Sequence, residues 1–155
     1  SKYIPEKKGV VLAFASMYGN TENAVNALAT RLAERGVKDI RMYDVSDTHP
    51  SYIISDIFKY SNVVFASPTY NLQLYFPMDA LIRELSVLNI TNRKVSLIGN
   101  HTWASAALKH MTELVSNMKG MEIVGTPIDI KSSLREDREH ELDTLADDIY
   151  QSLQD

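Results

Sequence analysis

The chain alternates short apolar runs with longer segments in which apolar residues recur every three or four positions. The run at 10–15 is apolar throughout, which is typical of a strand buried on both sides. The run at 39–43 is more polar and is expected nearer a sheet edge, and Pro127 is expected to interrupt or end the last strand. Strands are predicted at 10–15, 39–43, 62–66, 94–98 and within 121–130.

The segments between these strands carry start and stop signals of helices. Pro50 follows His49 where a helix would begin, and proline is tolerated in a first turn. Gly36 and Gly120 each follow a helical pattern, at the position where a residue that accepts positive φ is favoured. Residues 133–136 have the spacing of a capping box. Helices are predicted over 23–35, from 50 through 58, over 78–85, over 108–118 and from 133 to 153.

This alternation of strands and helices predicts an α/β fold, in which helices cover both faces of a parallel sheet. Right-handed crossovers leave few topologies, and the doubly wound order 2-1-3-4-5 of a five-stranded sheet is the most common candidate. Residues 1–9 are polar and are expected to be a leader or an inter-domain connection. Residues 10–155 are expected to form one domain.

Composition and charge exclude several classes of function. The 155 residues are 45% apolar and 23% charged, the balance of an ordinary globular domain. The absence of cysteine excludes disulfides, thiolate nucleophiles, cysteine-ligated zinc and iron–sulfur clusters, and it fits a reducing cytoplasm. The net charge is −4, with the acidic excess in 131–155, where a solvated helix face is expected. The sequence contains no basic stripe of the kind that binds nucleic acid, and no apolar run long enough to span a membrane.

Ligands of open α/β sheets bind outside the carboxyl ends of the strands, where the strand order reverses. The predicted order points to the loops at 16–22, 67–77 and 99–105. The first loop carries hydroxyls, an amide and Gly19 but no lysine or arginine, so backbone N–H groups, hydroxyls and the helix dipole would hold a phosphate there. A plain capped turn is the alternative. Walker and dinucleotide motifs are absent, and Ala66 stands where a receiver domain of this topology needs an aspartate.

The other two loops contain aromatic residues. The second loop holds Tyr70, Tyr75 and Phe76, and the third holds Trp103, the only tryptophan. Aromatic side chains at such positions either cover the edge of the core or pack against a planar ligand. Core cover is the expected role of Tyr75 and Phe76, whereas a ligand contact is expected of Tyr70 and Trp103.

Three motifs, in order, resemble a known family. Residues 16–22, Ser-Met-Tyr-Gly-Asn-Thr-Glu, look like the phosphate-binding loop of flavodoxins. Residues 67–71, Ser-Pro-Thr-Tyr-Asn, and 99–103, Gly-Asn-His-Thr-Trp, resemble more specifically the C-terminal flavodoxin domain of flavodiiron proteins, or A-type flavoproteins. The resemblance covers about residues 10–153 and implies a flavodoxin-like fold. Thr102 stands where family members often carry glycine, the residue that permits a close backbone approach.

The resemblance implies noncovalently bound FMN, with its phosphate at the first loop and its isoalloxazine ring between the second and third loops. Backbone groups of the second loop would contact N5 and O4 of the ring, and those of the third would face N1, O2 and N3. Tyr70 and Trp103 are the candidates for packing against the ring. The implied cofactor-binding residues are Ser16, Met17, Tyr18, Gly19, Asn20, Thr21, Pro68, Thr69, Tyr70, Asn71, Asn100, His101, Thr102 and Trp103.

The same resemblance implies an electron-transfer domain rather than a complete enzyme, with no catalytic or metal-binding residue of its own. It would relay electrons to a diiron oxygen or nitric oxide reductase site outside this chain, in cis or in trans, from a rubredoxin-type donor, and a homodimer is compatible with it. The iron site of flavodiiron proteins needs a His/Asp/Glu cluster, whereas the four histidines here are scattered. Two alternatives stay open: a free-standing FMN-dependent NAD(P)H:quinone reductase, and a flavodoxin-like module that has lost FMN.

Trp103 gives a direct test of the expected ring contact. Because it is the only tryptophan, its fluorescence reports one site, and adding FMN to the apoprotein is expected to quench it strongly. Trp103→Ala is expected to lose on the order of 1–3 kcal/mol of FMN affinity, the range for stacking a planar base on an aromatic side chain. Unquenched emission from the FMN-loaded protein would place Trp103 away from the ring.

Overall fold

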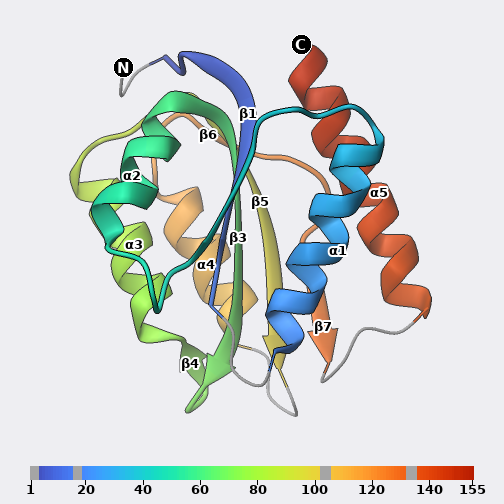
Figure 1. Ribbon diagram of the computed structural model, residues 1–155. Helices are drawn as coiled ribbons and strands as arrows, with labels where there is room; N and C mark the ends of the chain where they lie inside the picture. The colour runs from blue at the N-terminus through green and yellow to red at the C-terminus, as the bar shows by residue number, and fades with distance from the viewer. Residues whose placement is uncertain (1–3, 16–18, 102–105, 132–135) are drawn as a thin grey trace.

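Helices cover both faces of a sheet whose main strands are parallel (Figure 1). The computed structural model describes residues 4–15, 19–101, 106–131 and 136–155. The strands are β1 (Lys7–Phe14), β2 (Ile40–Asp44), β3 (Tyr60–Tyr70), β4 (Gln73–Leu74), β5 (Arg93–His101), β6 (Met121–Ile123) and β7 (Ile128–Lys131). The helices are α1 (Asn20–Glu34), α2 (Pro50–Lys59), α3 (Phe76–Val87), α4 (Ala107–Ser116) and α5 (Glu136–Gln154).

The strand order confirms the doubly wound topology. Strands follow one another in space as β2-β1-β3-β5-β6, and β7 also pairs with β5. Both β6 and β7 run parallel to β5, against its first and last residues respectively. Together they occupy the fifth position of the predicted order, and the break between them contains Pro127, as expected. The polar strand β2 lies at an edge, which the sequence also predicted.

Two apolar layers explain why β1 is apolar at every position from Val10 to Phe14. On β1, Val11 and Ala13 face the layer that includes buried residues of α2, α3 and α4. Val10 and Leu12, which alternate with them, face the layer formed with α1 and α5. Figure 1 shows α2, α3 and α4 on one side of the sheet and α1 and α5 on the other. No helix in the described part of the chain is long and apolar enough to cross a membrane.

Most predicted helix signals have their expected roles. Pro50 is the first residue of α2, and the His49 ring accepts a hydrogen bond from the backbone N–H of Ser51. Gly36 directly follows the C-cap of α1 with φ of 91°, the left-handed conformation that favours glycine. Gly120 also has positive φ, 77°, but α4 already ends at Ser116 with Asn117 as its C-cap, so this glycine lies in the turn before β6 instead of ending the helix. The predicted capping box has its first three residues outside the described part of the chain, and α5 is described from Glu136.

Three strands are longer than the apolar pattern predicts. β1 begins at Lys7, whereas the prediction began at residue 10. β3 and β5 run on to Tyr70 and His101, so the first residues of the two predicted loops are strand residues. β3 and β5 extend further because Ser67 and Pro68 still pair in parallel with Gly99 and Asn100, although these residues break the apolar pattern.

The acidic helix α5 is only partly the solvated face that its sequence predicts. Asp143 and Asp147 are more than half exposed, but each accepts a hydrogen bond from an arginine, Arg31 in α1 and Arg35 at its C-cap. The Nε atoms of Arg31 and Arg35 lie 2.7 Å from carboxylate oxygens of Asp143 and Asp147 respectively. The two arginines are four residues apart, and so are the two aspartates, so the two ion pairs lie one helical turn apart between α1 and α5.

The edge strand β2 is joined to α2 by a hydrogen bond from the Tyr43 hydroxyl to the Asp56 carboxylate. Burial and, after it, this hydrogen bond raise the pKa of Tyr43 to about 12. The folded state therefore favours the neutral phenol. This contribution to stability is complete below the ordinary tyrosine pKa of 10 and is lost as the pH rises from there towards 12.

A buried arginine closes the carboxyl end of α2. Arg93, the first residue of β5, is 1% exposed, and its guanidinium donates to the carbonyls of Ile57 and Phe58 at 2.9 and 2.7 Å. It also donates to the carbonyl of Thr91. These acceptors include carbonyls of the last helical turn, which have no partner within a helix. Burial lowers the pKa of Arg93, and the fork of donors offsets the cost of removing its charge from water.

Arg93→Met is expected to destabilise the fold by about 2–4 kcal/mol, because several buried carbonyls would lose their donor together. Thermal or urea unfolding measures the effect. Arg83→Met is the matched control, since Arg83 makes an exposed pair with Asp79 on α3 and is expected to change stability by less than about 0.5 kcal/mol. Equal losses in the two variants would contradict the role assigned to Arg93.

Candidate functional site

The carboxyl ends of β1, β3 and β5 meet at one edge of the sheet, where α1 and the β3–β4 hairpin also begin or end (Figure 1). The strand order reverses here, because the chain continues from β1 to β2 on one side and reaches β3 on the other. Polar residues that are rare in the core collect at this edge. Thr21, Ser67 and Asn100 are all buried there.

The first turn of α1 forms one wall of the site. Gly19 precedes the helix with φ of 81°, and as a glycine it contributes no capping side chain. The first N–H groups of a helix have no partner within the helix and lie at the positive end of its dipole. Thr21, in this turn, is completely buried. Gly19, Asn20 and Thr21 thus lie where the sequence placed a phosphate site, whereas Ser16, Met17 and Tyr18 lie outside the described residues.

Asn100 links the first and third predicted loops. It lies near the end of β5, is 6% exposed, and directs its side-chain amide at the Thr21 hydroxyl. The distance from Nδ2 of Asn100 to Oγ1 of Thr21 is 3.3 Å. Two predicted site residues that are distant in sequence are therefore brought together by their side chains, a contact that the sequence reasoning did not include.

Thr69 links the second predicted loop to the start of α4, directly after the third predicted loop. Its hydroxyl oxygen accepts hydrogen bonds from the backbone N–H groups of Ala106 and Ala107, at 3.1 and 3.0 Å. These are the N-cap and first residues of α4, which has no capping side chain of its own. The Thr69 side chain therefore holds the start of α4 against β3 in the manner of a helix cap.

A tight hairpin presents Tyr70 at the site. Tyr70 pairs with Gln73, and the two residues between them, Asn71 and Leu72, have φ of 49° and 63°. Positive φ at both central positions is characteristic of a type I′ turn. Tyr70 is 48% exposed, and its ring makes an edge contact with Tyr75 at 6.1 Å between ring centroids. One aromatic side chain is thus held in place but remains open to a ligand.

The expectations for the neighbouring aromatic residues are met in one case. Tyr75 is partly buried against the core, as predicted. Phe76 is 75% exposed, so its predicted role as a cover of the core edge is wrong. The reason is its position in α3: the buried stripe of this helix starts at Met78, and two residues of helix turn the side chain by about 200°.

His101 ends β5 beside an acidic residue that sequence reasoning missed. Its Nδ1 atom lies 2.9 Å from Oδ1 of Asp129 on the neighbouring strand β7. Both residues line a cavity of about 600 Å³ between β7 and α5. The only sequence signal for Asp129 is a carboxylate between two isoleucines of a strand. Thr102 and Trp103, the other residues predicted here, lie outside the described residues.

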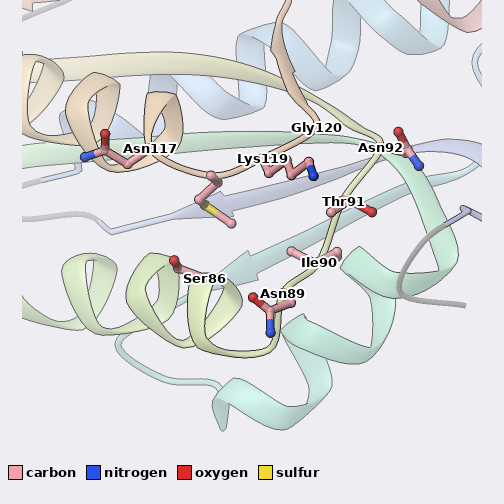
Figure 2. A pocket seen from close by; sticks show the side chains of 9 residues that line it. Ser86, Asn89, Ile90, Thr91, Asn92, Asn117, Lys119 and Gly120 are labelled. Atoms are coloured by element: carbon pink, nitrogen blue, oxygen red, sulfur yellow. The ribbon is translucent and has the colours of Figure 1, made fainter.

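A second cavity, of about 530 Å³, lies at the opposite edge of the sheet. It is lined by residues just before β5 and just before β6, and Figure 2 shows the polar side chains of Asn89, Thr91, Asn117 and Lys119 among them. This cavity is at the amino ends of the strands, away from every predicted site residue. Within the described ranges, no group of three or more His, Cys, Asp or Glu residues could hold a metal ion.

The family model described as Flavodoxin matches residues 12–144 of this chain. The chain belongs to the flavodoxin family. Membership implies flavin binding, with FMN as the flavin, and a role in electron transfer. The predicted resemblance to flavodiiron proteins is also confirmed, because curated relatives of this flavodoxin domain include the flavo-diiron protein FprA2 of Clostridium acetobutylicum, 29% identical over 125 residues.

The curated relatives are much longer than this chain. The match to FprA2 covers 77% of the chain and 28% of that protein. The anaerobic nitric oxide reductase flavorubredoxin of Escherichia coli is 21% identical over 104 residues, covering 66% of this chain and 22% of that protein. The flavodoxin domain therefore spans less than a third of the curated relatives it matches.

Solved structures show the fold in two settings. The rubredoxin oxygen:oxidoreductase of Desulfovibrio gigas superposes with a TM-score of 0.90 at 23% identity, covering 97% of this chain and 37% of that chain. A flavodoxin from the domain Archaea superposes with a TM-score of 0.82 at 18% identity, covering 95% of this chain and 99% of the other. The same fold thus occurs both as part of a longer protein and as nearly an entire chain.

The hairpin turn yields a test that does not depend on the cofactor. Leu72 is 62% exposed and has positive φ, which costs a side-chain-bearing residue about 1–2 kcal/mol relative to glycine. Leu72→Gly is expected to stabilise the fold by about 0.5–1 kcal/mol after the entropy of glycine is subtracted. Chemical denaturation measures the difference.

The matched control is Val87→Gly, since Val87 is 72% exposed but ends a helix, where glycine is unfavourable. It is expected to lose stability. A loss on Leu72→Gly would show instead that contacts of the leucine side chain outweigh the strain of its turn.

Proposed function

We propose that this flavodoxin domain binds FMN noncovalently at the carboxyl edge of its sheet and relays electrons to a diiron oxygen or nitric oxide reductase site outside this chain. The observation that carries the proposal is the convergence of the first turn of α1 with the ends of β3 and β5, through the contact between Thr21 and Asn100. A phosphate site and a ring site would then lie side by side at the switch point of the topology.

The donors at α1 fit a phosphate. The segment 16–22 supplies hydroxyls and backbone N–H groups, and it contains no lysine or arginine. Gly19 has nothing within 4 Å of the position that a Cβ atom would occupy, so the backbone there is open to a close approach. Dipole, N–H groups and hydroxyls together form an anion site of the kind found at helix N-termini. The residues proposed to hold the phosphate are Ser16, Met17, Tyr18, Gly19, Asn20 and Thr21.

The ends of β3 and β5 fit a planar ring. Pro68, Thr69, Tyr70 and Asn71 continue β3 into its hairpin, and Tyr70 has a partly exposed ring. We assign the opposite side to Asn100, His101, Thr102 and Trp103. The Thr69 hydroxyl accepts two hydrogen bonds from the start of α4, so its own hydrogen and its backbone groups are what Thr69 would offer a ligand.

FMN, when bound, supplies the redox chemistry, and the protein's part is to hold the cofactor and set its surroundings. Thr21 and the N–H groups of α1 would fix one end of the cofactor. Tyr70 would shield a ring face from water, and backbone groups of the second and third loops would set the polarity around the ring edge. None of these tasks requires a nucleophile or a general base.

Two observations support an electron acceptor outside this chain. The described part of the chain offers no cluster of metal ligands, and reduction of oxygen to water takes four electrons, whereas one FMN stores at most two. Relatives whose printed names are flavo-diiron protein and nitric oxide reductase flavorubredoxin are several times longer than the matched region. We propose a diiron partner in cis or in trans, a rubredoxin-type donor and a cytoplasmic location, with a homodimer as one arrangement.

The FMN-loaded protein is expected to be yellow, to be reduced by light or dithionite, and to pass electrons to an added diiron partner or an artificial acceptor. It is expected not to turn over nitric oxide, and not to oxidise NAD(P)H faster than free FMN, since the sequence has no dinucleotide fingerprint. Stopped-flow spectroscopy and an oxygen electrode measure these rates, with free FMN as the control.

Each alternative has its own outcome in this experiment. Multiple turnovers with NAD(P)H and a quinone would establish a quinone reductase instead of a carrier. A colourless protein that takes up no FMN on titration would establish a flavodoxin-like module without a flavin. Reduction that slows with added salt would locate a charged donor surface, although Asp143 and Asp147 are already paired within the fold.

A further inference from the structure

We infer that Asn100 is a positioning residue for the phosphate end of the cofactor: its side-chain amide orients the Thr21 hydroxyl as a donor towards the phosphate. This inference rests on the proposed FMN site and deepens it. The sequence assigned Asn100 to the ring, through its backbone. The structure instead directs its side chain to α1, 79 positions away in the sequence.

The contact is buried at both ends. Thr21 has no exposure and Asn100 has 6%. Neither polar side chain can therefore exchange its partner for bulk water without opening the edge of the sheet. Among the residues that the structure describes, Asn100 is the one hydrogen-bond partner of the Thr21 hydroxyl. The strand β5 also fixes the position of Asn100 through backbone pairs with Pro68 on one side and Ile130 on the other.

The direction of this hydrogen bond determines what the hydroxyl can do. An amide NH₂ group only donates, whereas a hydroxyl has one donor hydrogen and two acceptor lone pairs. When Nδ2 of Asn100 donates to Oγ1 of Thr21, it occupies a lone pair and leaves the hydroxyl hydrogen for another acceptor. A phosphate oxygen at the N-terminus of α1 is an acceptor of this kind.

This orientation matters because the segment that would hold the phosphate contains no positively charged side chain. With no lysine or arginine in 16–22, the affinity for a phosphate depends on neutral donors and the helix dipole. A hydroxyl that turned its hydrogen away would present a lone pair to a charged oxygen. It would then repel the phosphate instead of binding it.

A second buried asparagine provides a matched control. Asn62 on β3 is 3% exposed, and its Nδ2 atom donates to the hydroxyl of Ser152 at 2.9 Å. It has the same chemistry as Asn100 but lies near the amino end of its strand, away from the proposed site. Any effect of losing a buried amide on the fold alone is expected equally from Asn62.

The experiment compares FMN with riboflavin, which has the same ring and lacks the phosphate. Flavin fluorescence titration of the apoprotein is carried out for Asn100→Leu and Asn100→Asp. Both variants are expected to bind FMN about ten- to a hundredfold more weakly, the effect of a lost charge-assisted hydrogen bond. Riboflavin affinity is expected to stay within about threefold, and Asn62→Leu is expected to change neither affinity.

A double-mutant cycle tests the route through Thr21. Thr21→Val removes the hydroxyl, and adding Asn100→Leu to it is expected to cause little further loss of FMN affinity. If Asn100→Leu does not fold, Asn100→Ser takes its place, because its hydroxyl is one atom too short to reach Thr21. The folded fraction of each variant is measured by circular dichroism before titration.

The outcomes are distinct. Equal losses for FMN and riboflavin, additive losses in the cycle, or a loss confined to Asn100→Asp would overturn the positioning role, while FMN binding by the unmodified protein would leave the proposed function intact. If the unmodified protein binds neither flavin, the proposed function fails together with the inference. Selective, non-additive loss of FMN affinity supports both.

Discussion

Burial of both faces of the parallel sheet is the constraint on which the rest of this structure depends. With α2, α3 and α4 on one face and α1 and α5 on the other, the inner strands β1 and β3 have no wet surface along most of their length. The buried polar side chains of the candidate site gather where the strands end. Those that do so, such as Thr21 and Asn100, are still buried and must bond to one another.

The layered fold was predictable because its signals are local. An unbroken apolar run such as that of β1 indicates two covered faces, and Gly36 and Pro50 mark helix ends through their own backbone preferences. The hairpin with β4 was not predicted, since Asn71 is a usual turn residue but Leu72 in the left-handed conformation is not. The lengths of β3 and β5 were also not predicted, because pairing between strands extends them past their apolar residues.

The strand ends that meet at the candidate site could be predicted from the sequence, but the side-chain bonds between them could not. The switch point follows from the topology, and the loops that reach it follow from the strand ends. The bonds of Thr69 to the start of α4, and of Asn100 to Thr21, join residues 37 or more positions apart, so no local pattern contains them. They give each of these residues a role as a brace between elements, in addition to any contact with a ligand.

Both ends of the described chain lie at the end of the sheet opposite the candidate site. Pro5, Lys7 and Asp155 line one shared cavity, and the last turn of α5 lies at the far end of the molecule from the β3–β4 hairpin (Figure 1). At about 3.3 Å per residue, the eleven residues of β3 extend over roughly 35 Å. A protein fused to either end would therefore start on the far side and leave the candidate site open, and a redox centre tethered to the same chain would reach that site only through a linker that spans the sheet or from a second copy of the chain.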